Sequence, residues 1–247
     1  MDATDIKKII SLWLVFILLI LFPVPAFASM QNYRTYLVET YGLSEVYVQP
    51  GAEPLAMQAM QNFDTACKII GVEASRQIIQ RWKEVRGGFR LVIALPEGPF
   101  YALFDDLGAI YMYVNPGAPQ YGRLPTGFVC TVKSAVHEMM HAMDYGLLGE
   151  CKAIASAQGS WEIGRINGEY EGYTDANQYA SDHAADSAFE DFADTAAIMI
   201  MSGGETPCTL DKSTILYQKY DAIYNRLRKA FGPEAPMVQR CAQFLGK

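Results

Sequence analysis

The hydrophobic positions of the chain follow helical spacing in some stretches and strand spacing in others, which predicts a mixed fold. Residues 54–69 and 73–86, separated by Gly71, repeat apolar residues every three to four positions. Each stretch is therefore predicted to be a helix with one buried face. Two further helices are predicted near the end of the chain, at about 210–230 and 234–245.

Three short apolar runs between these helices predict strands. A pair of glycines ends the helical pattern at residue 88, and Phe89–Leu95 then reads as the first strand. Tyr101–Phe104 and Ala109–Val114 read as the second and third strands, joined by a turn at residues 105–108. The three strands are expected to form one small sheet.

The segment after this sheet predicts another amphipathic helix. Thr131 is expected to cap its start and Gly146 to end it. The helix is expected to lie half buried, at the wall of a cleft. Its apolar stripe has helical spacing and comprises Val136, Met139, Met140, Met143 and Leu147.

This helix carries the pattern HExxH, at His137, Glu138 and His141, in a chain with only three histidines. Helical positions four apart lie on one face, so the two imidazoles can bind one metal ion together. Glu138 projects about 100° round the same turn, where it can take a proton from a metal-bound water. A catalytic zinc site has three protein ligands and leaves the fourth position to water, so a third ligand is required.

The third ligand is expected from farther along the chain. In the HExxHxxGxxH pattern a glycine and a third histidine follow at once, but Asp144 and Leu147 hold those places here. Residues 187–200 read as a second amphipathic helix, on which Glu190 and Asp194 are four apart and share one face. We take Glu190 as the third metal ligand and Asp194 as the carboxylate that holds a ligating histidine by its far ring nitrogen.

Other residues compete for the place of the third ligand. Glu171 and Asp175 have the same spacing, but the residues between them are poor helix formers. Glu162 lies nearer to the motif in sequence and has no acidic partner four residues on. His183 lies in a polar stretch that reads as solvated, yet imidazole suits zinc well.

With both motifs in view, the chain resembles the gluzincin zinc metallopeptidases. More narrowly, it is similar to the anthrax lethal factor-type catalytic domain and the bacterial zinc peptidases grouped with it. In those proteins the first motif often continues as HExxHxxD, matched by Asp144. The second motif often reads Glu-[Asp/Phe]-Phe-Ala-Glu, against Glu-Asp-Phe-Ala-Asp at 190–194 here. The resemblance covers about residues 85–200 and implies an α+β, helix-rich zincin-like domain, with one small sheet preceding the HExxH helix.

The resemblance also implies two further features of the site. A tyrosine shortly before the glutamate helps to stabilise the oxyanion; His183 stands at the first position to try, and Tyr179 is the nearest tyrosine upstream, with Tyr173 as an alternative. In addition, one edge strand of the sheet pairs with the extended substrate, and Ala109–Val114 is the candidate for that strand.

The N-terminus reads as a signal peptide. Lys7 and Lys8 precede an apolar run from Ile9 to Phe22, and an Ala-x-Ala site predicts cleavage after Ala28. The run is short for a membrane-spanning helix. The protein is therefore expected to be secreted or extracytoplasmic, with residues 29–247 forming a single domain.

The net charge limits the classes of binding partner, and the cysteine count limits the possible disulfides. The net charge is −7 and no basic cluster occurs, which argues against nucleic acid or an anionic membrane surface as partner. Export permits disulfides, but five cysteines leave at least one unpaired within the chain. A bridge between Cys208 and Cys241 is the weakly preferred pairing.

Together these features predict an exported zinc metallopeptidase, more in keeping with an endopeptidase than an exopeptidase, that hydrolyses peptide bonds of a peptide or protein substrate. Two alternatives remain open. One is a catalytically silent zincin-fold binding protein, against which the intact Glu138 speaks. The other is a structural zinc domain, which would need a fourth ligand such as Cys130 or Cys151.

Overall fold

The computed structural model describes residues 24–96, 100–105, 107–117, 124–144, 179–203 and 211–247. The chain divides into two compact units, Met1–Tyr36 and Leu37–Lys247. The described part of the first unit is helical, because α2 (Val24–Tyr41) begins there and continues into the second unit. The expected signal peptide lies mostly outside the described residues, and cleavage after Ala28 stays a prediction.

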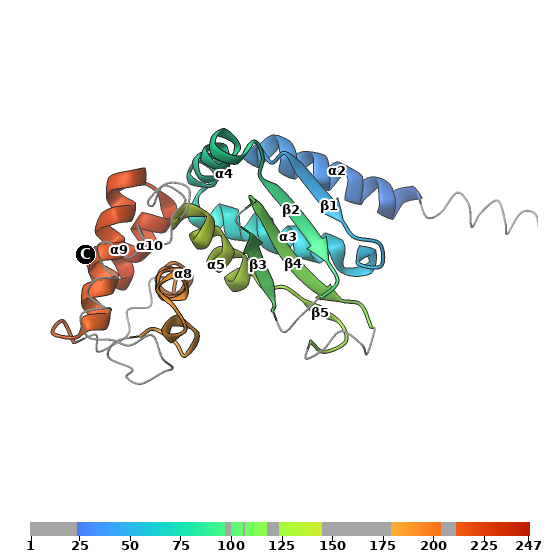
Figure 1. The fold of residues 1–247 in the computed structure, drawn as a ribbon. Helices are drawn as coiled ribbons and strands as arrows, with labels where there is room; N and C mark the ends of the chain where they lie inside the picture. The colour runs from blue at the N-terminus through green and yellow to red at the C-terminus, as the bar shows by residue number, and fades with distance from the viewer. Residues whose placement is uncertain (1–23, 97–99, 106, 118–123, 145–178, 204–210) are drawn as a thin grey trace, which may run out of the picture. The chain divides into compact units, whose positions relative to one another are not determined.

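The second unit is an α+β fold that holds a small mixed sheet, as expected (Figure 1). The strand order is β1-β2-β4-β3, formed by β1 (Glu45–Val48), β2 (Arg90–Ala94), β3 (Ala102–Asp105) and β4 (Ala109–Asn115). β1, β2 and β4 run parallel, and β3 runs antiparallel to β4. The short β5 (Phe128–Val129) pairs with the end of β4. β1 and β5 were not predicted from the sequence.

The pairing corrects the expected edge strand. Ala109–Val114, predicted to lie at the edge, is the central strand β4, with β2 on one side and β3 on the other. Its side chains are almost all buried, as a strand paired on both sides requires. The edge of the sheet on this side is β3, which lies beside the HExxH helix.

Two predicted helices, α3 (Glu53–Ile70) and α4 (Val72–Arg86), connect β1 to β2. Gly71 separates them in a backbone conformation with φ +109°, which glycine tolerates better than other residues. α3 packs on the sheet and on the HExxH helix, α5 (Val132–Met143). The core between them is apolar and includes Met60, Phe63, Ile78, Trp82, Leu91, Ile110, Met112 and Met139.

In the described residues after α5, the chain continues as α8, α9 and α10 (Figure 1). α8 (Ala188–Met201) follows the short 3-10 helix η2 (His183–Ala185) and packs against α5. α9 (Ile215–Phe231) and α10 (Pro236–Phe244) pack on the far side of α8. α5 therefore lies between α8 and the layer formed by α3 and the sheet.

Candidate metal centre

Contacts at both ends of α5 hold the helix that carries the HExxH residues. Thr131 caps the helix, because its side chain accepts a hydrogen bond of 3.1 Å from the backbone N–H of Ser134. Near the other end, the indole N–H of Trp82 donates to the backbone carbonyl of Ala142 at 2.6 Å. The helix is buried from Ala135 to Met143 rather than half buried as expected, since neighbours cover it on both sides.

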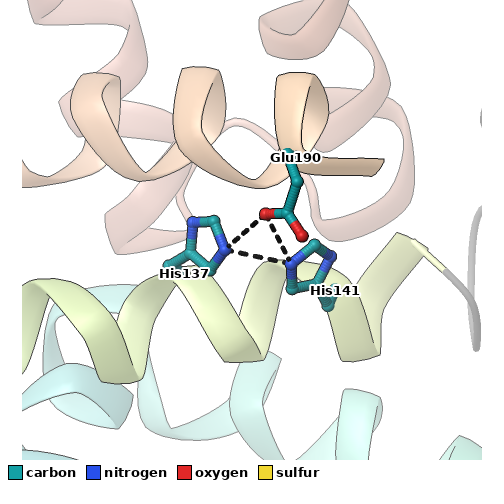
Figure 2. Close-up of side chains that lie close together, drawn as sticks. All are labelled: His137, His141 and Glu190. Carbon is teal, nitrogen blue, oxygen red and sulfur yellow. Dashed lines mark hydrogen bonds and ion pairs between the residues drawn. The ribbon is translucent and has the colours of Figure 1, made fainter. Parts of the chain in front are cut away.

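α8 brings the carboxylates to this helix. Ser187 caps α8 by accepting a hydrogen bond from the backbone N–H of Glu190. Ser187-x-x-Glu190 has the spacing of a capping box, in which the glutamate side chain would turn back to the first residue. Here the Glu190 carboxylate points instead at the two histidines of α5 (Figure 2). Its place in the first turn of a helix also favours a negative charge.

Three ligand atoms meet between the two helices (Figure 2). The Nε2 atoms of His137 and His141 are 3.0 Å apart. Oε2 of Glu190 lies 3.0 Å from Nε2 of His137 and 3.3 Å from Nε2 of His141. The group could hold a metal ion, as its ligand atoms all lie within 4.8 Å of one another.

The chemistry of this donor set fits a divalent cation. Tetrahedral ligands with bonds of about 2.0–2.1 Å lie roughly 3.3–3.4 Å apart, close to the three separations here. Oε2 of Glu190 is buried and makes no hydrogen bond of normal geometry, although ring nitrogens surround it at 3.0–3.3 Å. A cation bound between the three atoms would satisfy this oxygen and separate the two facing nitrogens. Two imidazoles and one carboxylate suit zinc and leave one position open.

Asp194 supports the ligand set from behind. Its Oδ1 lies 2.8 Å from Nδ1 of His137, so Nδ1 donates to Asp194 and Nε2 turns toward the metal position. The other carboxylate oxygen accepts a hydrogen bond from the hydroxyl of Ser181. That hydroxyl also accepts the backbone N–H of Ala184, at 3.0 Å. Ser181 could not be predicted from the sequence, because its polar stretch carries no signal of this contact.

Contacts between the imidazoles and the carboxylates of the site favour the charged forms of His137 and Glu190. Burial opposes the charged form of His137, yet its contacts with Asp194 and Glu190 raise the pKa of this imidazole to about 10. Burial works against the charged form of Glu190 as well, but the facing histidines hold its pKa well below the usual range. A proton on His137 thus balances part of the negative charge of Asp194 and Glu190.

Glu138 lies on the next part of the same turn and is buried. Burial raises the pKa of this carboxyl, and the nearby His141 and His137 work in the opposite direction. Glu138 accepts a hydrogen bond from the backbone N–H of Phe104 on β3. The carboxylate therefore lies between the candidate metal position and the edge of the sheet.

His183 and Tyr179 lie in different surroundings. Nε2 of His183 is 3.0 Å from Oε2 of Glu190, so this histidine borders the site, although it does not join the group of three. Tyr179 is buried against Ala184 and Ala185, and the ammonium of Lys219 lies 4.2 Å from its ring centre. These contacts give Tyr179 a packing role, and its expected part in oxyanion stabilisation stays a prediction.

Two cysteines that the sequence analysis considered, Cys130 and Cys241, are free thiols in the core. Cys241 is a free buried thiol, so the expected bridge to Cys208 is wrong. Cys130 is also free and buried, and it is not part of the metal-ligand group. The remaining rival residues lie outside the described part of the chain: Cys151, Glu162, Glu171, Tyr173 and Asp175.

Comparisons with protein-family models, curated proteins and solved structures give no match for this chain. Among the described residues, no helix is both long enough and apolar enough to cross a membrane. The function must therefore be argued from the site itself.

Proposed function

We propose that this protein is a zinc-dependent metallopeptidase. One observation carries the proposal: His137, His141 and Glu190 direct three ligand atoms to one point, and Glu138 lies beside them in the HExxH arrangement. The set has the ligand count of a catalytic site, which leaves one position for water. A zincin-like fold fits this arrangement, since the sheet precedes α5 and its edge strand lies next to it.

When bound, zinc would lower the pKa of a water molecule and polarise the carbonyl of the scissile peptide bond. Glu138 would accept the proton of the attacking water and pass it to the leaving amine. Burial favours this role, because a raised pKa makes the carboxylate a stronger base near neutral pH. Asp194 would keep the proton of His137 on Nδ1.

The edge strand suggests how a substrate lies. Within the described residues, β3 pairs with β4 on one side only, and α5 flanks it. An extended peptide could add to this strand by backbone hydrogen bonds, which would bring its peptide bonds past Glu138. In this proposal β3, and not Ala109–Val114, is the strand that pairs with the substrate. Binding of an extended peptide along β3 suits a peptide or protein substrate that is cleaved within its chain, as by an endopeptidase.

A structural zinc site is the second candidate function. It is favoured by the burial of the two histidines, which are only 7% and 8% exposed. In the described part of the chain, the more exposed side chains at the site are Glu190, at 25%, and His183, at 54%. A structural site usually has four protein ligands, and the group in the described residues has three.

The test measures zinc content and hydrolysis of a mixed peptide library by the purified protein. We expect one zinc per chain, and loss of that zinc in His137→Ala and His141→Ala. Glu138→Gln should keep the zinc and the fold but lose about 10²- to 10⁴-fold in hydrolysis, because the amide cannot accept the proton. Glu73→Gln on the exposed surface of α4 is the matched control and should leave both unchanged.

Three outcomes separate the candidates. Absence of stoichiometric zinc after zinc-replete expression contradicts every zinc-based function. Bound zinc without any hydrolysis favours a structural site or a silent binding protein. Equal turnover by the wild type and Glu138→Gln would show that another residue acts as the base, so the proposed mechanism would be wrong.

A further inference from the structure

A cavity of about 400 Å³ lies between α3 and α10, and it is lined by none of the three metal-ligand residues. From α3 it is lined by Thr65, Lys68 and Ile69, whose spacing places them on one face of the helix. Gly71, which follows α3, lets the start of α10 come close, because a Cβ there would lie only 2.7 Å from Cδ of Pro236. A cavity of this volume falls within the usual range for sites that bind small molecules.

The side of the cavity formed by α10 is mainly polar. Gln239, Arg240 and Gln243 follow Pro236 at helical spacing and share its face of the helix. Among the described residues that line the cavity, the charged side chains are Lys68 and Arg240, and none is acidic. The cavity is therefore a local positive site in a chain whose net charge is −7.

Arg240 is held by a contact that leaves its terminal nitrogens for a ligand. Its Nε donates to the backbone carbonyl of Ile200, in the last turn of α8, at 2.5 Å. Within the described part of the chain, Arg240 forms no ion pair with a carboxylate. The bond to Ile200 fixes the plane of the guanidinium group, whose two terminal nitrogens form a fork that matches a carboxylate or a phosphate.

Nearby carboxylates reduce the positive charge only in part. Nζ of Lys68 lies 2.6 Å from Oδ2 of Asp64, but the side chain of Lys68 is 54% exposed and its ammonium has three donors. Glu234, just before α10, accepts a hydrogen bond of 3.3 Å from one of the two glutamines. We therefore expect Arg240 to make the strongest contact with a ligand and Lys68 to make a weaker one.

We propose that this cavity binds a small organic anion, whose carboxylate or phosphate group accepts two hydrogen bonds from Arg240 and one from Lys68. The two glutamines bond to further polar groups of the ligand, and Ile69 and Pro236 contact its carbon skeleton. The site does not depend on the proposed peptidase function. It lies beside the metal-bearing helices, because α3 packs against α5 and α10 packs against α8.

The experiment titrates succinate and, separately, inorganic phosphate into the ¹⁵N-labelled full-chain protein at constant ionic strength. An anion can also bind at the metal centre, so the readout is the NMR signal of individual residues. We expect saturable shifts of the Nε–H signal of Arg240 and of the amides at 65–69 and 236–243. Succinamide, which has the same skeleton without charge, should bind at least about tenfold more weakly. The anion with the lower Kd identifies the acid group that the site prefers.

Arg240→Lys and Arg76→Lys form a matched pair of variants. Arg76 also donates from Nε to a carbonyl near a helix end, that of Thr40, but it does not line the cavity. Arg240→Lys should raise the Kd about tenfold, because lysine keeps the charge and loses the fork. Arg76→Lys should leave the Kd unchanged.

Lys68→Gln provides a second test that does not alter the contact of Arg240 with α8. Because Lys68 is exposed and shares its charge with Asp64, this variant should raise the Kd only about two- to fivefold. Circular dichroism checks that each variant is folded. If Arg240→Lys does not fold, the Kd of Lys68→Gln against that of Arg76→Lys decides.

Four results would overturn the inference. They are the absence of saturable binding with a Kd below about 10 mM, equal Kd values for succinate and succinamide, shifts confined to the residues around the metal centre, and a Kd that no cavity variant changes. Each of them leaves zinc binding and peptide hydrolysis untouched, so the proposed function stands or fails separately.

Discussion

The buried ion pair between Lys219 and Asp191 holds the helix that supplies Glu190. Nζ of Lys219 on α9 lies 2.6 Å from Oδ2 of Asp191 on α8, and the two side chains are only 2% and 1% exposed. Thr195 donates a further hydrogen bond to Asp191, at 3.2 Å. Burial raises the pKa of Asp191 and lowers that of Lys219, and their mutual contact opposes both shifts.

Lys219→Met tests the energetic role of this pair. Methionine fills a similar volume but leaves the Asp191 carboxylate buried without its counter-charge. Removing one partner of a buried pair typically costs about 3–5 kcal/mol, far more than the loss of an exposed pair. The remaining hydrogen bond from Thr195 and protonation of Asp191 should keep the cost at about 3 kcal/mol. For a protein of this size, that corresponds to a fall in Tm of roughly 6–12 °C.

The assay is urea or thermal unfolding of the metal-free protein, followed by circular dichroism. Lys247→Met is the matched control, because Lys247 pairs with Asp221 at the surface and its loss should cost less than about 1 kcal/mol. The double variant Lys219→Met/Asp191→Leu replaces both charges by apolar groups and should recover most of the stability. If Lys219→Met costs no more than Lys247→Met, the pair does not hold α8 and the reasoning is wrong.

Two further predictions concern the metal. Asp194→Asn should weaken zinc binding about 10- to 100-fold in a chelator competition, because His137 loses the carboxylate that orients it; unchanged affinity would contradict that role. Zinc must also displace the proton of His137, whose pKa is raised to about 10. Zinc affinity should therefore rise with pH, by up to about tenfold per unit for each proton displaced, and a flat profile in zinc titrations between about pH 6 and 8 would exclude it.

Local patterns predicted the elements of the fold well. The helix expected at residues 54–69 is α3, that at 73–86 is α4, and the segment from Ser187 forms α8. The cap of α5 is Thr131, as predicted. These features depend on neighbours within a few residues, such as apolar spacing, a capping side chain or a glycine. A sequence displays such signals directly.

Features that depend on distant contacts could not be predicted in the same way. β4 has the composition of either an edge strand or a central strand, and only its pairing with both β2 and β3 decides. β1 is four residues long and was missed. His183 read as solvated because nothing in its polar stretch indicates that Glu190, seven residues on, turns back toward it. Ser181 was missed for the same reason.

The site combines two helices whose positions have separate causes. α5 is held by the core around Trp82, so the two histidines are fixed by the same packing that folds the sheet layer. α8 meets α5 at a cluster of carboxylates and imidazoles and is tied to α9 by Lys219. Such a cluster favours metal binding, because a bound cation supplies the positive charge that protons on the ligands would otherwise supply. The free energy of zinc binding should then appear as added stability of the contact between α5 and α8.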